Sequence, residues 1–179
     1  MPKYTDIKPW LDKDGTIKAV IETPRGCRNK YAFDDKSETF NLKKTLPEEM
    51  VFPYNFGFIP QTVAADGDPV DVLVLMDEPV FAGCICEIKL IGILYAEQIE
   101  KGKKKAVENN RLLGISLETH MYKDIKNIKD LGHNFTKELE NFFVTYNEMG
   151  DKKYIPKGTG GVNKSLKYVK KMNKKYRKQ

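Results

Sequence analysis

The stretch D-G-D-P-V-D-V-L-V-L at residues 66–75 places an acidic loop directly before a short apolar run. Gly67 and Pro69 favour a bend in the acidic part, because proline lacks the N–H group that a sheet ladder requires. The apolar run that follows is continuous and short, which is typical of a single buried strand. The sequence therefore predicts a strand from Val70 to Leu75 with a loop rich in carboxylates at its start.

Three carboxylates crowd this loop, at Asp66, Asp68 and Asp71. Neighbouring carboxylates repel one another and resist burial, so a cluster of this kind usually requires a cation. Hard oxygen ligands beside a rigid strand suit Mg²⁺, with Mn²⁺ as a substitute ion. A solvated acidic turn is the alternative interpretation, and the bracketing by glycine and proline favours the metal site.

Two other motifs resemble known sites and fail on particular positions. Residues 66–77 have the length of a calcium EF-hand loop, but Asp71 occupies the position that requires glycine and Pro69 disrupts the loop. Residues 158–165 (G-T-G-G-V-N-K-S) differ from a phosphate-binding P-loop at Asn163. Too little chain follows them for a nucleotide-binding fold, so we expect a loop that leads into a helix.

Length and composition are typical of one globular domain that spans residues 1–179. The chain has 179 residues, of which 40% are hydrophobic and 31% are charged. It shows neither a signal peptide nor an apolar run long enough to cross a membrane, so we expect a cytoplasmic protein without a membrane partner. The odd number of cysteines, Cys27, Cys84 and Cys86, favours reduced core thiols over a disulfide framework.

The net charge of +6 makes acidic partners plausible, namely phosphates, nucleotides or nucleic acid. Much of the excess lies in a basic helical tail at about residues 160–179. Such a tail could bind nucleic acid, and an OB-like nucleic-acid-binding module is one alternative function. A solvated helix face is the commoner outcome, so nucleic acid is not the partner that we expect.

The strand pattern favours a mainly β (α+β) fold. Strand-like runs occur at residues 16–23, 30–33, 40–42, 70–75, 84–95 and 111–117, with a charged hairpin tip at 99–105. Residues 51–60 are aromatic and are interrupted by proline and glycine, and we expect them to line a pocket wall. Short strands at close spacing, without alternating long helices, favour a small closed β-barrel.

Two amphipathic helices are predicted near the C-terminus. The first is marked by apolar residues every three or four positions and ends before Gly150; its residues are Leu131, Phe135, Leu139, Phe142, Phe143 and Tyr146. The second is marked by Leu166, Val169, Met172 and Tyr176, and its other face is rich in lysine. Both helices should pack on the barrel.

Hydrolysis or transfer of phosphate groups requires more than an acidic loop. It needs cations on the phosphate oxygens and a positioned water molecule. Candidate cations on predicted strands are Lys30, Lys43, Lys44 and Arg111, and Glu22 lies at a strand end where it could join a metal shell. Each of these is significant only if the fold brings them to one pocket.

The motif D-G-D-P-V-D-V-L-V at 66–74 resembles the signature of the soluble, family I inorganic pyrophosphatases. The segments P-Y-N-F-G-F-I-P at 53–60, V-I-E-T-P at 20–24, N-K-Y at 29–31 and L-I-G-I-L at 90–94 follow the order of that family. The resemblance covers about residues 15–150. It implies an OB-like closed five-stranded β-barrel with flanking C-terminal helices, Mg²⁺-dependent hydrolysis of pyrophosphate to two phosphates by a metal-activated water, and a homo-oligomer.

The resemblance also implies roles for individual residues. Asp66 and Asp71 match metal ligands of the family, and Asp68 matches the carboxylate that activates the attacking water. Glu22 matches a glutamate of the catalytic pocket. The groups that would bind the phosphates are Lys30, Lys44 (or Lys43 with a one-residue gap), Arg111 and Tyr146.

Several positions depart from the family pattern. A carboxylate is replaced by Ala32, an arginine by Lys44 and a tyrosine by Phe56. Two metal-binding aspartates fall near Glu97-Gln98 and on Asn109, and the lysine that follows the helix tyrosine is Asn147. Each lost hydrogen bond to a charged group costs about 1.5–3 kcal/mol. The sequence is therefore also compatible with reduced activity, with an altered substrate, or with a non-catalytic relative that binds phosphate or nucleotide.

Overall fold

The computed structural model describes residues 4–10 and 15–178. Most strands belong to one sheet, in the order β1-β4-β5-β8-β6-β7 with β9 added to β6, and β2 and β3 form a separate ribbon. The strands are β1 (Thr16–Thr23), β2 (Asn29–Asp34), β3 (Thr39–Thr45), β4 (Asn55–Ile59), β5 (Val70–Leu75), β6 (Ile85–Glu100), β7 (Val107–Glu108), β8 (Arg111–Ser116) and β9 (Lys152–Gly161). The helices are α1 (Gly132–Glu148) and α2 (Val162–Tyr176), with 3₁₀ turns η1 (Tyr4–Asp6) and η2 (Ile128–Leu131).

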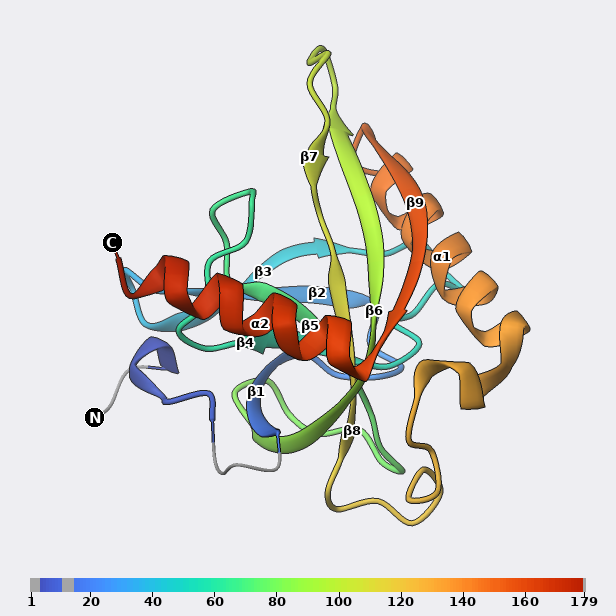
Figure 1. Cartoon of the computed structure of the whole chain (residues 1–179). Helices are drawn as coiled ribbons and strands as arrows, with labels where there is room; N and C mark the ends of the chain where they lie inside the picture. Colours follow the sequence, from blue (N-terminus) through green and yellow to red (C-terminus); the bar gives the residue numbers. More distant parts are fainter. Residues whose placement is uncertain (1–3, 11–14, 179) are drawn as a thin grey trace.

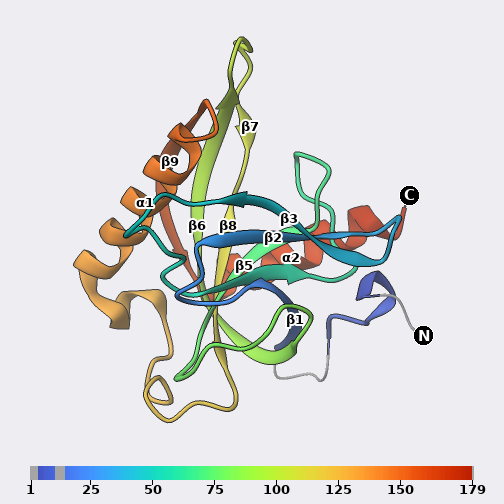
Figure 2. The same ribbon diagram turned by 180° about the vertical axis from the view of Figure 1, so that it is seen from behind.

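The main sheet closes on itself (Figures 1 and 2). Strand β1 pairs antiparallel with β4 on one side and with the first part of β6 on the other. The strands β1, β4, β5, β8 and β6 therefore form a ring of five, which confirms the predicted closed, mainly β, OB-like fold. The ribbon of β2 and β3 lies over one side of this ring (Figure 2).

The acidic motif leads into a strand that is buried on both faces. Val70, Val72 and Val74 of β5 pack into one apolar cluster, together with residues of β1, β6 and α2. Leu73 and Leu75 point the other way, into a second cluster that includes residues of α1. Because successive side chains of a strand alternate between its faces, a strand that is covered on both sides requires a continuous apolar run.

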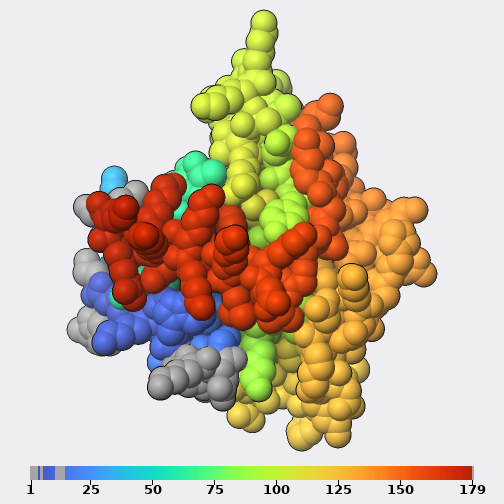
Figure 3. Space-filling view, in the orientation of Figure 1, coloured from blue at the N-terminus to red at the C-terminus, as the bar shows by residue number. Residues whose placement is uncertain are grey.

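The two predicted helices are both present. Leu139 and Phe143 of α1 are buried in the second cluster, and α1 packs against β9. Tyr168, Val169 and Met172 of α2 are buried in the first cluster, and α2 lies across one face of the molecule (Figure 3). Within the described residues, neither helix is long and apolar enough to cross a membrane.

The aromatic segment 51–60, for which the sequence predicted no strand, contains β4, and each residue of Asn55–Ile59 is buried. A Cβ atom at Gly57 would lie 1.9 Å from the Val20 carbonyl oxygen, so the pairing of β1 with β4 requires glycine there. Gly57 therefore permits a strand, although a glycine at this point of the sequence suggested that a strand would be interrupted.

The segment 158–165 does lead into a helix, but the predicted loop was wrong. Strand β9 runs through Gly161 and α2 begins at Val162. A Cβ atom at Gly160 would lie 2.9 Å from the Ile93 side chain, which shows how closely β9 approaches β6. Because of these glycines, β9 lacks the alternation of apolar and polar residues that would predict a strand. It forms a strand by pairing with the long strand β6.

A hairpin extends from the ring at one end. Strand β6 continues to Glu100, the chain turns at Gly102 with a φ of +76°, and it returns through β7. This arrangement confirms the predicted charged hairpin tip, which projects beyond the rest of the molecule (Figures 1 and 3).

Candidate active site

The acidic loop is held at its base by hydrogen bonds of its own chain. Thr62 Oγ1 donates to the Ile59 carbonyl oxygen at 2.6 Å and accepts from the Val70 backbone N–H at 2.9 Å. Across the loop, the Ala64 N–H donates to the Asp68 carbonyl oxygen at 2.8 Å. Gly67, with a φ of +98°, makes the turn between the first two aspartates. The loop is therefore a defined turn that presents Asp66 and Asp68 to solvent.

Helix α2 fastens the same loop from outside. Asn173 Nδ2 donates to the Gln61 carbonyl oxygen at 2.6 Å, and Lys175 Nζ donates to the Ala64 carbonyl oxygen at 2.7 Å. Both acceptors lie just before the aspartates. The basic helix, whose sequence indicated no role in the site, thus helps to position the acidic loop.

Asp71 and Arg111 come together because β5 and β8 are parallel neighbours. The register pairs Val72 with Leu112, so the residues that precede these two begin their strands side by side. Arg111 Nε lies 3.7 Å from Asp71 Oδ2, and the two side chains are 4% and 29% exposed. Burial raises the pKa of Asp71 to about 7, and the positive charges of Arg111 and Lys30 oppose this shift.

Arg111 is held between aromatic rings. Its guanidinium carbon lies 4.0 Å from the ring centre of Phe143 in α1 and 4.8 Å from that of Tyr154 in β9. One terminal nitrogen donates to the Asn109 carbonyl oxygen at 3.3 Å, whereas Nε is buried and has no hydrogen-bond partner among the described residues. The guanidinium is a fixed, desolvated cation with hydrogen-bonding capacity to spare.

Glu22 and Lys30 form a second buried ion pair. Lys30 Nζ lies 2.7 Å from Glu22 Oε2, and the other carboxylate oxygen accepts from the Phe33 backbone N–H at 2.8 Å. The Lys30 ammonium also sits 4.2 Å from the ring centre of Phe56. At this position, Phe56 offers an aromatic face to a cation in place of the hydroxyl that the family resemblance implies.

Lys44 lies over Tyr146. Its Nζ is 3.6 Å from the ring centre of Tyr146 and donates to the carbonyl oxygen of that residue at 3.3 Å. Burial lowers the pKa of Lys44, and the positive charges of Lys152 and Lys30 lower it further. Burial raises the pKa of Tyr146 to about 12, so its hydroxyl keeps its proton at neutral pH.

The predicted site residues lie within electrostatic reach of one another. Lys30, Glu22, Asp66 and Arg111 all shift the pKa of Asp71. Asp71, Glu22 and Arg111 in turn shift that of Tyr146. Lys30 acts on Lys44, while Asp68 and Arg111 act on Asp66. Glu22, Lys30, Asp66 and Arg111 therefore lie around Asp71, and Tyr146 is in reach of the same group. Lys44 lies beside Lys30 and Tyr146, and Asp68 lies beside Asp66 in the loop.

The positions that depart from the family pattern make different contacts in the structure. Asn109 Nδ2 donates to Gln98 Oε1 at 2.8 Å, which makes a neutral pair between β6 and the segment that joins β7 to β8. Asn147 is buried and donates to the Phe143 carbonyl oxygen at 2.7 Å, so it caps a turn of its own helix. Ala32 lies in the ribbon opposite Asn41.

The site offers two carboxylates whose chemistry suits a hard divalent cation. Burial raises the pKa of Asp66, and the neighbouring Asp68 carboxylate adds to the shift; the pKa of Asp71 is raised as well. A bound cation would relieve both shifts. The described residues contain no group of three or more Asp, Glu, His or Cys side chains arranged for a metal. Mg²⁺ fits this donor set, because it is commonly bound by one or two carboxylates together with substrate phosphates and water.

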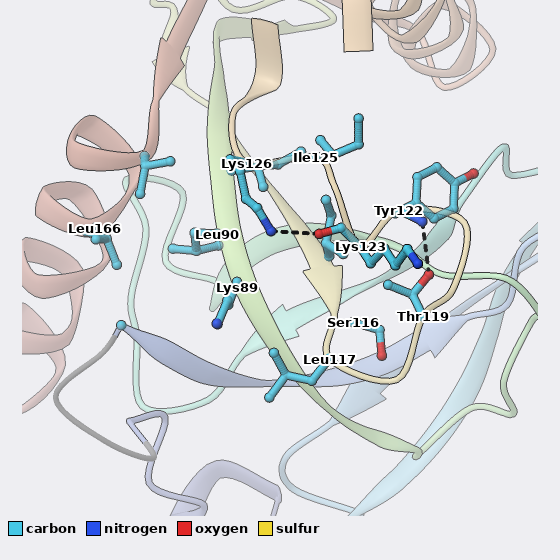
Figure 4. A pocket seen from close by; sticks show the side chains of 14 residues that line it. Lys89, Leu90, Ser116, Leu117, Thr119, Tyr122, Lys123, Ile125, Lys126 and Leu166 are labelled. Atoms are coloured by element: carbon cyan, nitrogen blue, oxygen red, sulfur yellow. Dashed lines mark hydrogen bonds between the residues drawn. The ribbon is translucent and has the colours of Figure 1, made fainter. Parts of the chain in front are cut away.

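A cavity of about 330 Å³ lies elsewhere, between β6, β8 and the start of α2 (Figure 4). Leu90, Tyr122 and Leu166 are among its lining residues, and none of the predicted site residues lines it. Lys126 at its edge donates to the Lys123 carbonyl oxygen at 2.7 Å. This cavity is separate from the carboxylate site.

Sequence reasoning missed three residues that shape the site. Tyr154 and Phe143 hold Arg111, and Asn173 fastens the acidic loop. Phe143 was predicted only as a core residue of its helix. Nothing in the sequence indicated the roles of the other two residues. Tyr154 lies on a strand without alternating apolar residues, and Asn173 lies on a basic helix.

Comparison with known proteins identifies the class. A family model described as "Inorganic pyrophosphatase" matches residues 19–177. The inorganic pyrophosphatase of Synechocystis is 35% identical over 169 residues, which are 94% of this chain and 96% of that protein. That of Picrophilus torridus is 29% identical over 178 residues, 99% of this chain and 97% of that protein.

Solved structures agree with this match. The inorganic pyrophosphatase of Thermus thermophilus superposes with a TM-score of 0.89 at 28% identity, over 98% of this chain and 99% of that one. The enzyme of Helicobacter pylori gives a TM-score of 0.83 at 28% identity, over 96% and 98% of the two chains. The structure thus belongs to the class of proteins that carry carboxylates and buried cations at one end of an OB-like ring of strands. The chain belongs to the inorganic pyrophosphatase family.

Proposed function

We propose that this protein hydrolyses inorganic pyrophosphate to two phosphates. The observation that supports the proposal is the convergence of Arg111 and Lys30 on the Asp71 carboxylate at the start of β5, with Lys44 close to Lys30. Pyrophosphate is a small, dense anion, and a cleft with several fixed cations suits it. Membership of the inorganic pyrophosphatase family supports the same reaction.

The family supports a divalent metal cofactor in general, and we propose that it is Mg²⁺, with Mn²⁺ as a substitute. Asp66 and Asp71 would hold it, with substrate oxygens and water completing the shell. When bound, the ion supplies charge neutralisation and a lowered pKa for coordinated water.

The side chains of the protein would perform the remaining steps. Asp68 stands exposed in the loop and would accept a proton from the attacking water, while Glu22 orients the pocket through its bond to Lys30. The water oxygen forms a bond to one phosphorus as the bond from that phosphorus to the bridging oxygen breaks. Lys30, Lys44 and Arg111 would stabilise the charge that develops on the phosphate oxygens, and the protonated Tyr146 hydroxyl would donate a hydrogen bond.

A second candidate function is a non-catalytic relative that binds phosphate without rapid turnover. The neutral pair of Gln98 and Asn109 favours it, since the resemblance places metal-binding aspartates at these positions. Both candidate functions predict that the protein binds phosphate groups. They differ in whether bound pyrophosphate is hydrolysed.

One experiment separates them. Purified protein is supplied with pyrophosphate at increasing Mg²⁺ concentration, and both phosphate release and pyrophosphate binding are measured. Metal-dependent release above that of a heat-inactivated sample supports the hydrolase, and binding without release identifies the non-catalytic relative. Binding to neither pyrophosphate nor phosphate contradicts both.

We also propose that residues 1–179 act as one functional unit, that copies of the chain associate, and that the protein is cytoplasmic. These proposals rest on composition and on the resemblance to the family. Sedimentation of the purified chain over a range of concentrations tests the association.

A further inference from the structure

A cavity of about 220 Å³ lies between the acidic loop and the β6–β7 hairpin. Asp66 lines it from the loop, Gln98 and Glu100 line it from β6, and Asn109 lines it from the segment between β7 and β8. Lys103 and Lys105 line it from the hairpin. The hairpin therefore forms part of the same end of the molecule as the proposed active site (Figure 1).

The strand wall of the cavity carries a neutral amide pair, Gln98 and Asn109, beside the carboxylate of Glu100, and the amide pair can donate a hydrogen bond. Because Gln98 Oε1 accepts from Asn109 Nδ2 at 2.8 Å, the Gln98 amide oxygen is occupied. The Gln98 amide nitrogen has no hydrogen-bond partner among residues 4–10 and 15–178. An amide nitrogen carries two donor hydrogens, and neither would repel an anion.

The hairpin wall contributes positive charge. Lys103 forms an ion pair with Glu100, whose other oxygen lies 3.7 Å from Lys152 Nζ. Lys105 has no ion-pair partner among the residues that the structure describes. Glu100 is therefore shared by two lysines, and the ammonium group of Lys105 is left available to a ligand.

The size of the cavity limits what it can hold. A volume of 220 Å³ corresponds to roughly seven water molecules at about 30 Å³ each. It is smaller than the 300 Å³ or more that pockets for drug-sized ligands usually have (about 300–1,000 Å³). A phosphate group with its hydrating water fits, whereas a base and a sugar would extend beyond it.

We propose that this cavity binds one phosphate group directly, through Lys103, Lys105 and the Gln98 amide nitrogen. The inference deepens the proposed function, because the phosphate would belong to a substrate or product of that reaction. Two sources share this chemistry, namely a phosphate of pyrophosphate or orthophosphate and the third phosphate of tripolyphosphate. In either case the hairpin lysines determine which inorganic phosphates are bound.

The test is calorimetric binding of orthophosphate, pyrophosphate and tripolyphosphate in the presence of EDTA, with and without the double substitution Lys103→Gln and Lys105→Gln. The matched control is Lys104→Gln, which lies on the same hairpin and does not line the cavity. We expect the double variant to lose at least about tenfold in affinity, which is about 1.4 kcal/mol, and the control to change less than twofold.

The three ligands distinguish the sources. A loss for all three places orthophosphate or a terminal phosphate of pyrophosphate in the cavity, and a loss for tripolyphosphate alone assigns the cavity to the third phosphate. Equal affinities in the wild type, the double variant and the control would overturn the inference, as would the absence of binding to the wild type in EDTA. Gln98→Leu, which removes the donor at similar volume, should weaken the same ligands.

The calorimetric measurement of phosphate binding does not depend on turnover. Asp68→Asn should lower kcat by about 10²–10⁴-fold and leave phosphate affinity in EDTA within about twofold, because Asp68 does not line the cavity. If no variant or wild type hydrolyses pyrophosphate, the proposed function fails while the cavity is still tested. If hydrolysis is normal and the lysine variants bind as tightly as the wild type, only the inference about the cavity fails.

Discussion

The side-chain amide of Asn109 donates a hydrogen bond of 2.8 Å to the side-chain amide of Gln98, across the pairing of β6 and the β7–β8 segment. Two carboxylates at this separation would repel each other unless a cation lay between them. The amide pair satisfies itself without an ion. This end of the site is therefore stable as a neutral surface.

Substitution of Gln98 by Glu together with Asn109 by Asp should make this end of the site dependent on a cation. We expect the double variant to lose about 1–3 kcal/mol of stability in EDTA, because one carboxylate must be protonated or remain unpaired. Mg²⁺ should raise its melting temperature by more than it raises that of the wild type. Thermal unfolding with and without Mg²⁺ measures both effects, and an equal Mg²⁺ response in the two proteins would contradict this account.

Arg111 should be important for folding as well as for binding. Arg111→Met leaves the Asp71 carboxylate without its ion-pair partner, and we expect a loss of about 2–3 kcal/mol in urea unfolding. The value is below that of a fully buried pair because Asp71 is 29% exposed. In an Asp71→Asn background the same substitution should cost less, and equal costs in both backgrounds would show that the two charges are not coupled.

Lys44 should set an alkaline limit for activity. Burial lowers the pKa of its ammonium, so Lys44 loses its charge at a lower pH than an exposed lysine. Folding disfavours the charged form, so the cost of burying it is full below the folded pKa. That cost declines as the pH rises from the folded pKa to the higher unfolded pKa, above which it is gone. The rate constant kcat/KM for pyrophosphate should fall over the same range.

Lys44→Arg keeps its charge to higher pH and should move this alkaline fall upward. Lys43→Arg is the matched control, since Lys43 is the exposed neighbour on β3 and the residue that a one-residue gap in the family resemblance would select instead. A pH profile that shifts with Lys43→Arg but not with Lys44→Arg would assign the phosphate-binding role to Lys43.

Asn173 should control the acidic loop from a distance. Asn173→Ala removes the 2.6 Å bond to the Gln61 carbonyl oxygen and should cost about 1–3 kcal/mol of stability. The Mg²⁺ concentration for half-maximal activity should rise several-fold, while kcat at saturating Mg²⁺ changes less. The exposed neighbour Lys174→Ala serves as control, and a loss of kcat alone would argue against a positioning role.

The parts of the fold that could be predicted are those with a local pattern. Strand β5 was identified because it is covered on both faces and is therefore apolar throughout. The helices followed from their three- and four-residue spacing. Strands β4 and β9 gave no such pattern, because their glycines serve close contacts with β1 and β6, which lie far away in the sequence.

The site shows the same division. The sequence proposed the aspartates of the loop and the cations, and the structure places them within reach of one another. The aromatic cage of Arg111 and the hydrogen bonds from α2 to the loop depend on how separate elements pack. The cavity under the hairpin depends on the register of β6 with β7, which no local pattern sets.

Steady-state phosphate release from pyrophosphate in Mg²⁺, by the wild type and by Asp68→Asn, tests the central claim most directly. Asp68 is exposed, so the substitution should change stability by no more than about 0.5 kcal/mol, and Asp124→Asn provides an exposed control outside the site. We predict metal-dependent release by the wild type and the control, and a fall of about 10²–10⁴-fold in kcat for Asp68→Asn. Release at the same rate by Asp68→Asn, or no metal-dependent release by the wild type, would contradict the account.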